Sequence, residues 1–272
     1  MTADAVPADG PAGVSGPSDR VLDLFAVPGA VRPLAGRSVV AGDLVLSPGR
    51  DAAVAAWLNP TLARLAVRMD ERPRRRRRDL RLAVPVPARD GSWVVDGWGA
   101  TRYEPGTSPC ADVDVLVATG RALHAEFAVA VPRRPDVLDA RTDRWARAER
   151  LAFGAAEAWT GHLLLARAAA RLADVDLGSA QLVHADLAGN VLLDAAGAPV
   201  VIDVSPAWRP PRWAEAVCVV DAVARGQAPV ALERFTDPAG RQALLRAVAF
   251  RLLSDPPDLV AAYAPVLDAL GL

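Results

Sequence analysis

The chain has 272 residues, 52% hydrophobic and 23% charged, which suits a globular protein with one large domain or two smaller lobes. Its net charge of −1 provides no overall field that would attract nucleic acid or a membrane surface. All 31 basic residues are Arg, so the sequence excludes any mechanism that needs a lysine amine.

The beginning of the sequence and the two cysteines bear on where the protein works. Residues 1–17 lack the basic and then apolar order of an export signal, and their composition favours disorder. Cys110 and Cys218 are far apart in the sequence, and we expect two reduced thiols. No apolar run reaches the length of a membrane span. These features predict a cytoplasmic protein without a membrane partner.

Strand patterns and helix patterns alternate in the first part of the chain. The expected elements are a short helix at 19–27 capped by Ser18, two strands within 38–49, a helix at 51–69 and further strands within 80–106. Turns are expected at Gly42–Asp43 and Asp90–Gly91, and Pro60 is expected to mark a break or a restart of its helix. This order predicts a small lobe that contains a sheet.

Helical patterns dominate after Gly106. They cover 111–130, 143–175 and most of the chain beyond Trp213, and the main interruption is a pair of strand-like runs within 181–204. We therefore expect an α+β protein with two lobes. The predicted boundaries are a disordered segment at 1–17, a small sheet-containing lobe at 18–105 and a large, mostly helical lobe at 106–272.

The stretch QLVHADLAGNVLLDAAGAPVVIDV at 181–204 gathers most of the candidate functional residues. If its two apolar runs form a hairpin, Asn190 precedes one strand and Asp203 ends its partner, so the two residues are neighbours. Amide and carboxylate oxygens are suited to Mg²⁺, and Asp186 lies on the loop before the first strand, where it can serve as a base. Each residue alone is also common in turns. Their ordered combination indicates phosphoryl transfer.

HADLAGNVLL followed by VVIDV resembles the catalytic and metal-binding segments of the aminoglycoside phosphotransferase and choline kinase group, relatives of protein kinases. The resemblance implies a two-lobed protein-kinase-like fold with ATP or GTP as the phosphoryl donor. It implies Asp186 as the catalytic base and Asn190 and Asp203 as Mg²⁺ ligands. It also implies that His184 and Asp221 support the catalytic loop.

Two further segments extend the resemblance. RYEPG at 102–106 resembles the hinge between lobes, which implies that backbone groups of Arg102 and Glu104 meet adenine. DGWGATRYEPG and SPAWRPPRWAEAVCVVDA resemble an actinobacterial branch of unassigned substrate. The RPPR segment between Trp208 and Trp213 is either a place of contact with substrate or a rigid connector.

The first lobe departs from the family pattern. The strand Lys that holds phosphate should fall near Ser47, no Lys exists in the chain, and the helix at 51–69 contains no Glu to pair with one. The loop that covers the phosphates should lie near Gly36, its only glycine, with Arg37 or Arg50 as alternative sources of positive charge. The step from Asp186 to Asn190 is also one residue shorter than usual in the family.

Three functions remain open. The first is a kinase-like phosphotransferase that moves the γ-phosphoryl group of ATP or GTP to a hydroxyl of a small molecule. The second is a pseudokinase that acts as a binding or regulatory module, because the Lys–Glu pair and the glycine-rich loop are missing. The third is a nucleic-acid binder that uses the Arg74–Arg78 run.

Overall fold

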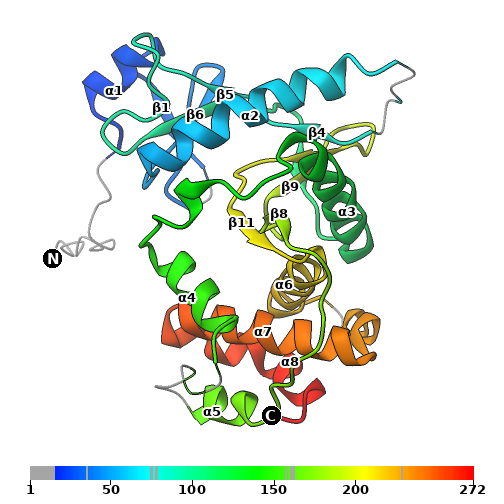
Figure 1. Cartoon of the computed structure of the whole chain (residues 1–272). Helices are drawn as coiled ribbons and strands as arrows, with labels where there is room; N and C mark the ends of the chain where they lie inside the picture. Colours follow the sequence, from blue (N-terminus) through cyan, green and yellow to red (C-terminus); the bar gives the residue numbers. More distant parts are fainter. Residues whose placement is uncertain are drawn as a thin grey trace, which may run out of the picture. The chain divides into compact units, whose positions relative to one another are not determined.

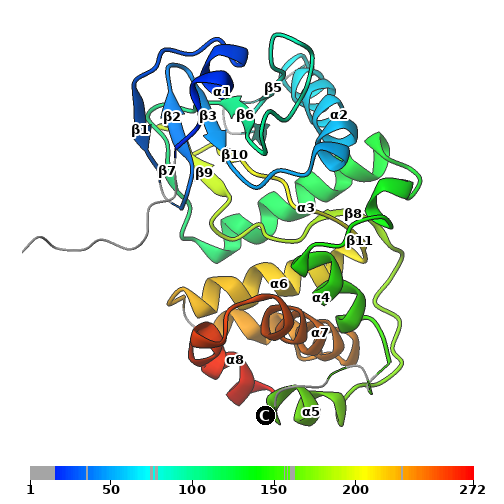
Figure 2. The same ribbon diagram turned by 90° about the vertical axis from the view of Figure 1, so that its left-hand side faces the viewer.

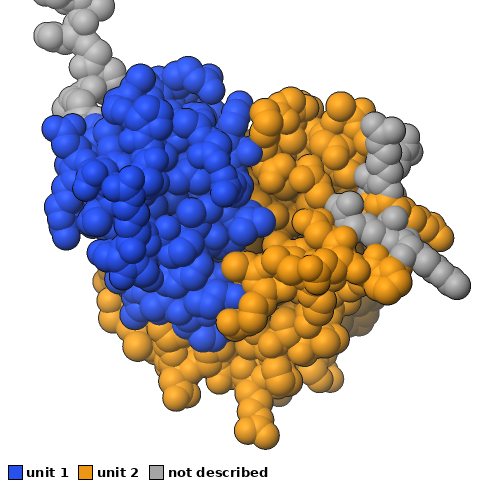
Figure 3. All heavy atoms as spheres, turned by 90° about the horizontal axis from the view of Figure 1, so that it is seen from above, with its two compact units in different colours: residues 1–60, 84–103 blue, residues 61–83, 104–272 orange. Residues whose placement is uncertain are grey.

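The computed structural model describes residues 16–34, 36–73, 76, 79–155, 157, 159, 163–227 and 229–272. Residues 1–15 of the expected disordered segment and four of the five arginines in the 74–78 run lie outside the described residues. The chain divides into two compact units (Figure 3). Unit 1 contains residues 1–60 and 84–103, and unit 2 contains residues 61–83 and 104–272.

Unit 1 is built on a five-stranded antiparallel sheet (Figure 1). Its strands, in spatial order, are β1 (Val31–Pro33), β2 (Val39–Ala41), β3 (Leu44–Ser47), β6 (Gly99–Arg102) and β5 (Pro85–Val86). The hairpin between β2 and β3 turns at Gly42 and Asp43 as predicted, and Gly42 adopts a positive φ of 59° that suits glycine.

One face of this sheet is covered by α1 (Asp19–Leu24), whose first turn is capped by the Ser18 side chain. Val21, Leu22 and Phe25 of this segment pack against buried strand residues such as Leu46. This helix and sheet form the hydrophobic core of unit 1, so the small sheet-containing region expected from the sequence is present.

The helix α2 (Ala52–Asp70) runs without interruption through Pro60, so the predicted break there is wrong. Proline removes one backbone donor from a helix interior, yet the flanking apolar residues Leu58 and Leu62 are both buried. Their burial offsets the loss of that hydrogen bond. Pro60 is nevertheless the residue at which the chain passes from unit 1 to unit 2.

Unit 2 contains two small sheets. One has the order β4 (Arg81–Leu82), β10 (Pro199–Val201), β9 (Val191–Leu193) and β7 (Ser108–Pro109), and the other pairs β11 (Pro206–Arg209) with β8 (Gln181–His184). The β9–β10 hairpin is the one predicted from the sequence. Residues 81–82 were expected in the first lobe, but they pair in parallel with β10 of unit 2. The Ala83 amide extends this pairing by donating to the Val201 carbonyl.

Most of the remaining described residues of unit 2 lie in helices, and the second half of α2 is among them. The α-helices are α3 (Val113–Ala130), α4 (Arg144–Ala152), α5 (Leu163–Ala169), α6 (Pro211–Ala224), α7 (Pro238–Ser254) and α8 (Ala264–Ala269), with short 3₁₀ segments η1 (Asp136–Leu138), η3 (Pro229–Phe235) and η4 (Pro257–Tyr263). The helical pattern over 143–175 gives two helices among the described residues, because α4 ends at Ala152, just before Gly154, and α5 begins at Leu163. The Leu151 carbonyl then accepts a hydrogen bond from the Trp159 indole.

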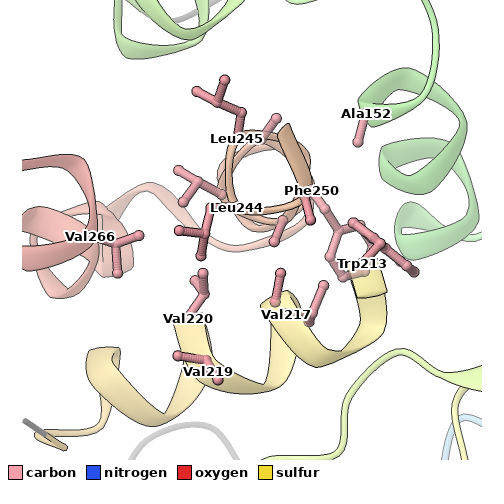
Figure 4. Packing of buried hydrophobic residues seen from close by; sticks show 14 of the residues in the cluster. Ala152, Trp213, Val217, Val219, Val220, Leu244, Leu245, Phe250 and Val266 are labelled. Atoms are coloured by element: carbon pink, nitrogen blue, oxygen red, sulfur yellow. The ribbon is translucent and has the colours of Figure 1, made fainter. Parts of the chain in front are cut away.

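The main core of unit 2 lies between α6 and α7, which cross each other and pack together at the crossing (Figures 1 and 2). Trp213 is fully buried and meets the rings of Phe153 and Phe250 edge to face at about 5.4 and 5.3 Å (Figure 4). Trp213 therefore belongs to the core and cannot touch a substrate. Among the described residues, no helix is long and apolar enough to cross a membrane.

Candidate active site

The candidate catalytic loop leaves β8 at His184. This residue is fully buried and is paired with Pro206 of β11 across the two-stranded sheet. Its ring nitrogen Nδ1 accepts hydrogen bonds from the backbone amides of Asp186 at 3.2 Å and Ser205 at 3.4 Å. His184 thus ties the start of the loop to the segment that follows Asp203.

A second buried histidine supports the first. The backbone amide of His184 donates to Nε2 of His124, on α3, at 3.1 Å. Burial, with a smaller contribution from His184, lowers the pKa of His124 to about 3. Burial also lowers the pKa of His184, although the nearby carboxylates of Asp186 and Asp203 oppose this effect. Both imidazoles are therefore neutral near pH 7, which their role as hydrogen-bond acceptors requires.

Asn190 is held by the loop in an orientation that leaves its oxygen for another partner. Its amide nitrogen donates to the backbone carbonyl of Asp186 at 2.6 Å and to the Oδ2 atom of the same residue at 3.2 Å. A side-chain amide whose nitrogen is used in this way presents its oxygen as the remaining group, and an oxygen is what Mg²⁺ binds.

Asp203 lies at the same end of the β9–β10 hairpin as Asn190. Val191 is opposite Val201, and the Ile202 amide donates to the Asn190 carbonyl at 2.9 Å, so Asp203 follows directly. Asp203 has a positive φ of 46°, one of three such non-glycine residues in the described chain. Aspartate tolerates this conformation better than most residues, and such backbone strain is concentrated at functional sites.

Asp221 lies on α6 and is buried, but it reaches the catalytic loop through a residue that sequence reasoning missed. Arg251, on α7, donates from Nε to Oδ1 of Asp221 at 2.7 Å and from Nη2 to Oδ2 of the same carboxylate. Its Nη2 also donates to Oδ1 of Asp186 at 2.7 Å. Burial alone would lower the pKa of Arg251, but Asp221 and Asp186 together raise it above its usual value, so the guanidinium is charged.

The loop between Asp186 and Asn190 is fixed by two further contacts. The Ala188 carbonyl accepts a hydrogen bond from the Arg225 guanidinium. Gly189 has a positive φ of 88°, and a Cβ atom built there would lie 2.4 Å from Nη1 of Arg225. The short loop therefore needs glycine both for its backbone conformation and for space.

The candidate phosphate-binding residues of unit 1 lie around the end of β3. Ser47 shares a hydrogen bond of 2.9 Å with the hydroxyl of Ser38, so it is occupied within the sheet. Two arginines are near this strand end. Nη2 of Arg37 lies 3.5 Å from a Cβ atom built on Gly49, and the stem of Arg50 packs beside Gly99, the partner of Ser47.

Gly36 occupies the turn between β1 and β2, with a positive φ of 72° and open space around its Cα atom. A turn between the first two strands is where a phosphate-covering loop was expected. The single glycine permits the turn, but a loop with several glycines would let backbone amides approach a phosphate more closely.

The predicted hinge residues are engaged in separate interactions. The Arg102 side chain forms an ion pair with Asp43 within unit 1, and its backbone amide donates to the Val84 carbonyl at 2.8 Å. The Glu104 carboxylate accepts a hydrogen bond of 3.1 Å from Arg81 within unit 2. Because the Arg102 amide is used by Val84, an adenine ring would need other backbone groups of this segment.

The donor set near Asp203 fits a Mg²⁺ ion that shares its coordination with a nucleotide. The described residues contain no group of three or more His, Cys, Asp or Glu side chains that could hold a metal ion. One carboxylate and one amide oxygen are insufficient for a metal site built only from protein, but Mg²⁺ is commonly bound by one or two protein oxygens together with phosphate and water.

Comparisons with known proteins find likeness in structure and none in sequence: no protein-family model and no curated protein matches the chain. An aminoglycoside phosphotransferase from Alicyclobacillus acidocaldarius superposes with a TM-score of 0.56, 15% identity and 95% coverage of both chains. The choline kinase LicA from Streptococcus pneumoniae gives 0.51, with 13% identity and coverage of 93% of this chain and 96% of that one.

A thermostable mutant of the aminoglycoside phosphotransferase APH(4)-Ia gives a TM-score of 0.50, with 16% identity and coverage of 92% of this chain and 96% of that one. At these low sequence identities, the comparison shows similarity of fold alone. The small antiparallel sheet followed by a mainly helical unit agrees with all three proteins. The chain therefore has the kinase-like α+β fold that aminoglycoside phosphotransferases and choline kinases share.

Proposed function

We propose that this protein is a kinase-like phosphotransferase that moves the γ-phosphoryl group of ATP or GTP to a hydroxyl group of a small molecule. The observation that carries the proposal is the arrangement around Asn190. Its amide nitrogen donates to Asp186, which leaves the amide oxygen for another partner, and its backbone carbonyl accepts from the Ile202 amide, next to Asp203. Two metal ligands and a base in this order are the parts that phosphoryl transfer needs.

Asn190 and Asp203 would hold Mg²⁺, which would neutralise charge on the nucleotide phosphates when it is bound. In unit 1, Arg37 and Arg50 would contribute the positive charge that a lysine supplies in related enzymes. Arginine binds phosphate well, although its planar, forked group needs a different approach from that of an ammonium ion.

Asp186 would act on the acceptor. Its side chain is 38% exposed, so a hydroxyl can reach it although the neighbouring residues Ala185 and Leu187 are buried. The carboxylate accepts the hydroxyl proton while the acceptor oxygen forms a bond to the γ-phosphorus and the bond from that phosphorus to the β–γ bridging oxygen breaks. The products are the phosphorylated acceptor and ADP or GDP.

The test is an assay of phosphoryl transfer by the full chain, with Mg²⁺·ATP or Mg²⁺·GTP as donor and a panel of small hydroxyl compounds as acceptors. The reaction is monitored by ³¹P NMR. We expect formation of ADP or GDP with a new phosphate ester, and loss of this turnover in Asp186→Ala and Asp203→Ala. Unchanged nucleotide turnover in both variants would contradict the proposal.

A second function, a binding or regulatory module of the same fold, is favoured by one specific observation. The chain contains no lysine, and α2 contains no glutamate, so both members of the usual Lys–Glu pair are absent. A module would bind nucleotide, seen as a rise in thermal stability with Mg²⁺·ATP, but would give no transfer to any acceptor.

A further inference from the structure

Arg251 contacts two carboxylates that have different surroundings. Asp221 is 5% exposed and receives two hydrogen bonds from the guanidinium, one from Nε and one from Nη2. Asp186 is 38% exposed and receives a third hydrogen bond, from the same Nη2 atom. The Arg251 side chain is itself only 5% exposed, so it is too enclosed to bind a substrate directly.

The first two hydrogen bonds have an ordinary structural explanation. A buried aspartate on α6 needs a partner, and an arginine in the last turn of α7 also interacts favourably with the helix dipole. The third hydrogen bond is not required for either purpose. It connects the buried pair to the exposed carboxylate that would act as the base.

With this third contact, both oxygens of the Asp186 carboxylate are held by the protein. Oδ1 accepts from Arg251 at 2.7 Å, and Oδ2 accepts from the amide of Asn190 at 3.2 Å. Two donors on opposite oxygens fix the plane of a carboxylate as well as its rotamer. A base has to lie within hydrogen-bond reach of the proton it accepts, so a fixed orientation favours transfer.

We propose that Arg251 is a positioning residue for phosphoryl transfer, which anchors on Asp221 and holds the Asp186 carboxylate in the orientation that receives the acceptor proton. The role rests on the function proposed above. It assigns a purpose to a buried arginine that lies 65 residues from Asp186 in the sequence.

The first experiment separates positioning from stability by kinetics. Arg251→Met alone leaves Asp221 buried and unpaired, so this variant is expected to be unstable. The double variant Asp221→Leu/Arg251→Met replaces the ion pair with apolar groups of similar size, an exchange that is often neutral or stabilising. Arg251→Lys keeps the charge, and Arg246→Met, on the same helix but bonded to the Ala152 carbonyl, is the matched control.

We expect the folded double variant to lose about 10- to 100-fold in kcat while its KM for Mg²⁺·ATP changes little, because a small misplacement of a reacting group has an effect of this size. Arg251→Lys should recover part of the loss, and Arg246→Met should retain wild-type kcat. A folded double variant with wild-type kcat would show that the pair is only structural, and the proposal would be wrong.

The second experiment needs no turnover, so it remains informative if the proposed enzymatic function fails. Thermal unfolding is measured for Asp186→Asn in the wild-type chain and in the double-variant background. If Arg251 holds Asp186, the change in Tm should differ between the two backgrounds by about 2–4 °C, the shift that corresponds to about 1 kcal/mol in a chain of similar size. Equal changes in Tm would overturn the contact itself.

Discussion

The two units of this molecule differ in how firmly they hold their candidate functional residues. In unit 2, the side chains of Asp186 and Asn190 are held by hydrogen bonds to one another and to buried neighbours. In unit 1, Ser47, which the family resemblance places at the position of the usual lysine, has its hydroxyl bonded to Ser38. The residues that would perform chemistry are thus supported more thoroughly than those that would grip the nucleotide.

We infer from this difference that orienting a base and metal ligands makes other physical demands than binding the phosphates of a nucleotide. A base and a metal site depend on orientation within about an ångström, which requires a buried frame such as His184, His124 and Arg251. Binding of phosphate depends mainly on positive charge, which arginines such as Arg37 and Arg50 can provide. The absence of lysine is therefore compatible with the proposed function.

The largest effect on activity is expected from substitution of Asp186 in unit 2. Asp186→Ala removes the base, and we expect nucleotide turnover to fall about 100- to 10,000-fold, the usual contribution of general base catalysis. Initial rates of ADP formation with the acceptor identified by ³¹P NMR provide the measurement. Asp258→Asn, an exposed carboxylate in η4, serves as the control and should retain full activity. Equal rates in Asp186→Ala and wild type would remove unit 2 from the mechanism.

A smaller effect, on nucleotide affinity, is expected from substitution of two arginines in unit 1. If Arg37 and Arg50 replace the missing lysine, Arg37→Gln and Arg50→Gln should each weaken binding of Mg²⁺·ATP by roughly tenfold or more, because a hydrogen bond to a charged group contributes about 1.5–3 kcal/mol. Calorimetric titration measures this affinity. Arg32→Gln, on the exposed β1 strand of the same sheet, is the matched control.

Ser47→Lys in the Arg37→Gln background tests whether a lysine can replace the positive charge that the arginine variant has lost. A lysine at the usual position should restore part of the affinity for Mg²⁺·ATP. Arginine variants that bind as tightly as wild type would show that unit 1 contributes no phosphate grip through these residues.

The catalytic loop in unit 2 is expected to be sensitive to a single methyl group. Gly189→Ala places a Cβ atom at a positive φ and against Arg225, so we expect a loss of about 1–3 kcal/mol in the free energy of unfolding. Gly178→Ala has the same backbone strain but open space around it, and its smaller loss isolates the contribution of Arg225. Urea unfolding followed by circular dichroism compares the two, and equal losses would contradict a close contact at Gly189.

Unit 2 is also expected to be sensitive to acid. The pKa of His124 is lowered to about 3 in the folded protein, whereas an unfolded histidine has a pKa near its usual 6.5. Its contribution to stability is therefore fully present above pH 6.5 and is lost as the pH falls towards 3, by up to about 1.4 kcal/mol per pH unit. His124→Gln should flatten the dependence of Tm on pH between 4 and 6. A dependence as steep as that of wild type would show that His124 is not responsible.

Much of unit 2's candidate site could be predicted because its signals are local. The β9–β10 hairpin follows from two apolar runs and the turn between them, and it brings Asn190 and Asp203 to one end without any long-range information. The sequence also shows directly that lysine is missing. The family resemblance implied the kinase-like fold, which the structure confirms.

The features that could not be predicted depend on packing between distant segments. In the sequence, Arg251 is an ordinary arginine within a helical pattern. Its contacts with Asp221 and Asp186 form only because α7 packs against α6. The strand β11, which ends at Arg209 where the RPPR segment begins, forms only by pairing with β8. Pro60 fails to break α2 because its apolar neighbours are buried, an effect that local propensity does not contain.

The measurement that tests the proposed function most directly is calorimetric titration of the full chain with Mg²⁺·ATP, compared with the same titration of Asp203→Asn. We expect saturable binding to the wild-type chain and binding at least about tenfold weaker in the variant, because a charged metal ligand is lost. Absence of binding to the wild-type chain at millimolar nucleotide, or equal affinity in the two proteins, would contradict a metal-nucleotide site at Asn190 and Asp203.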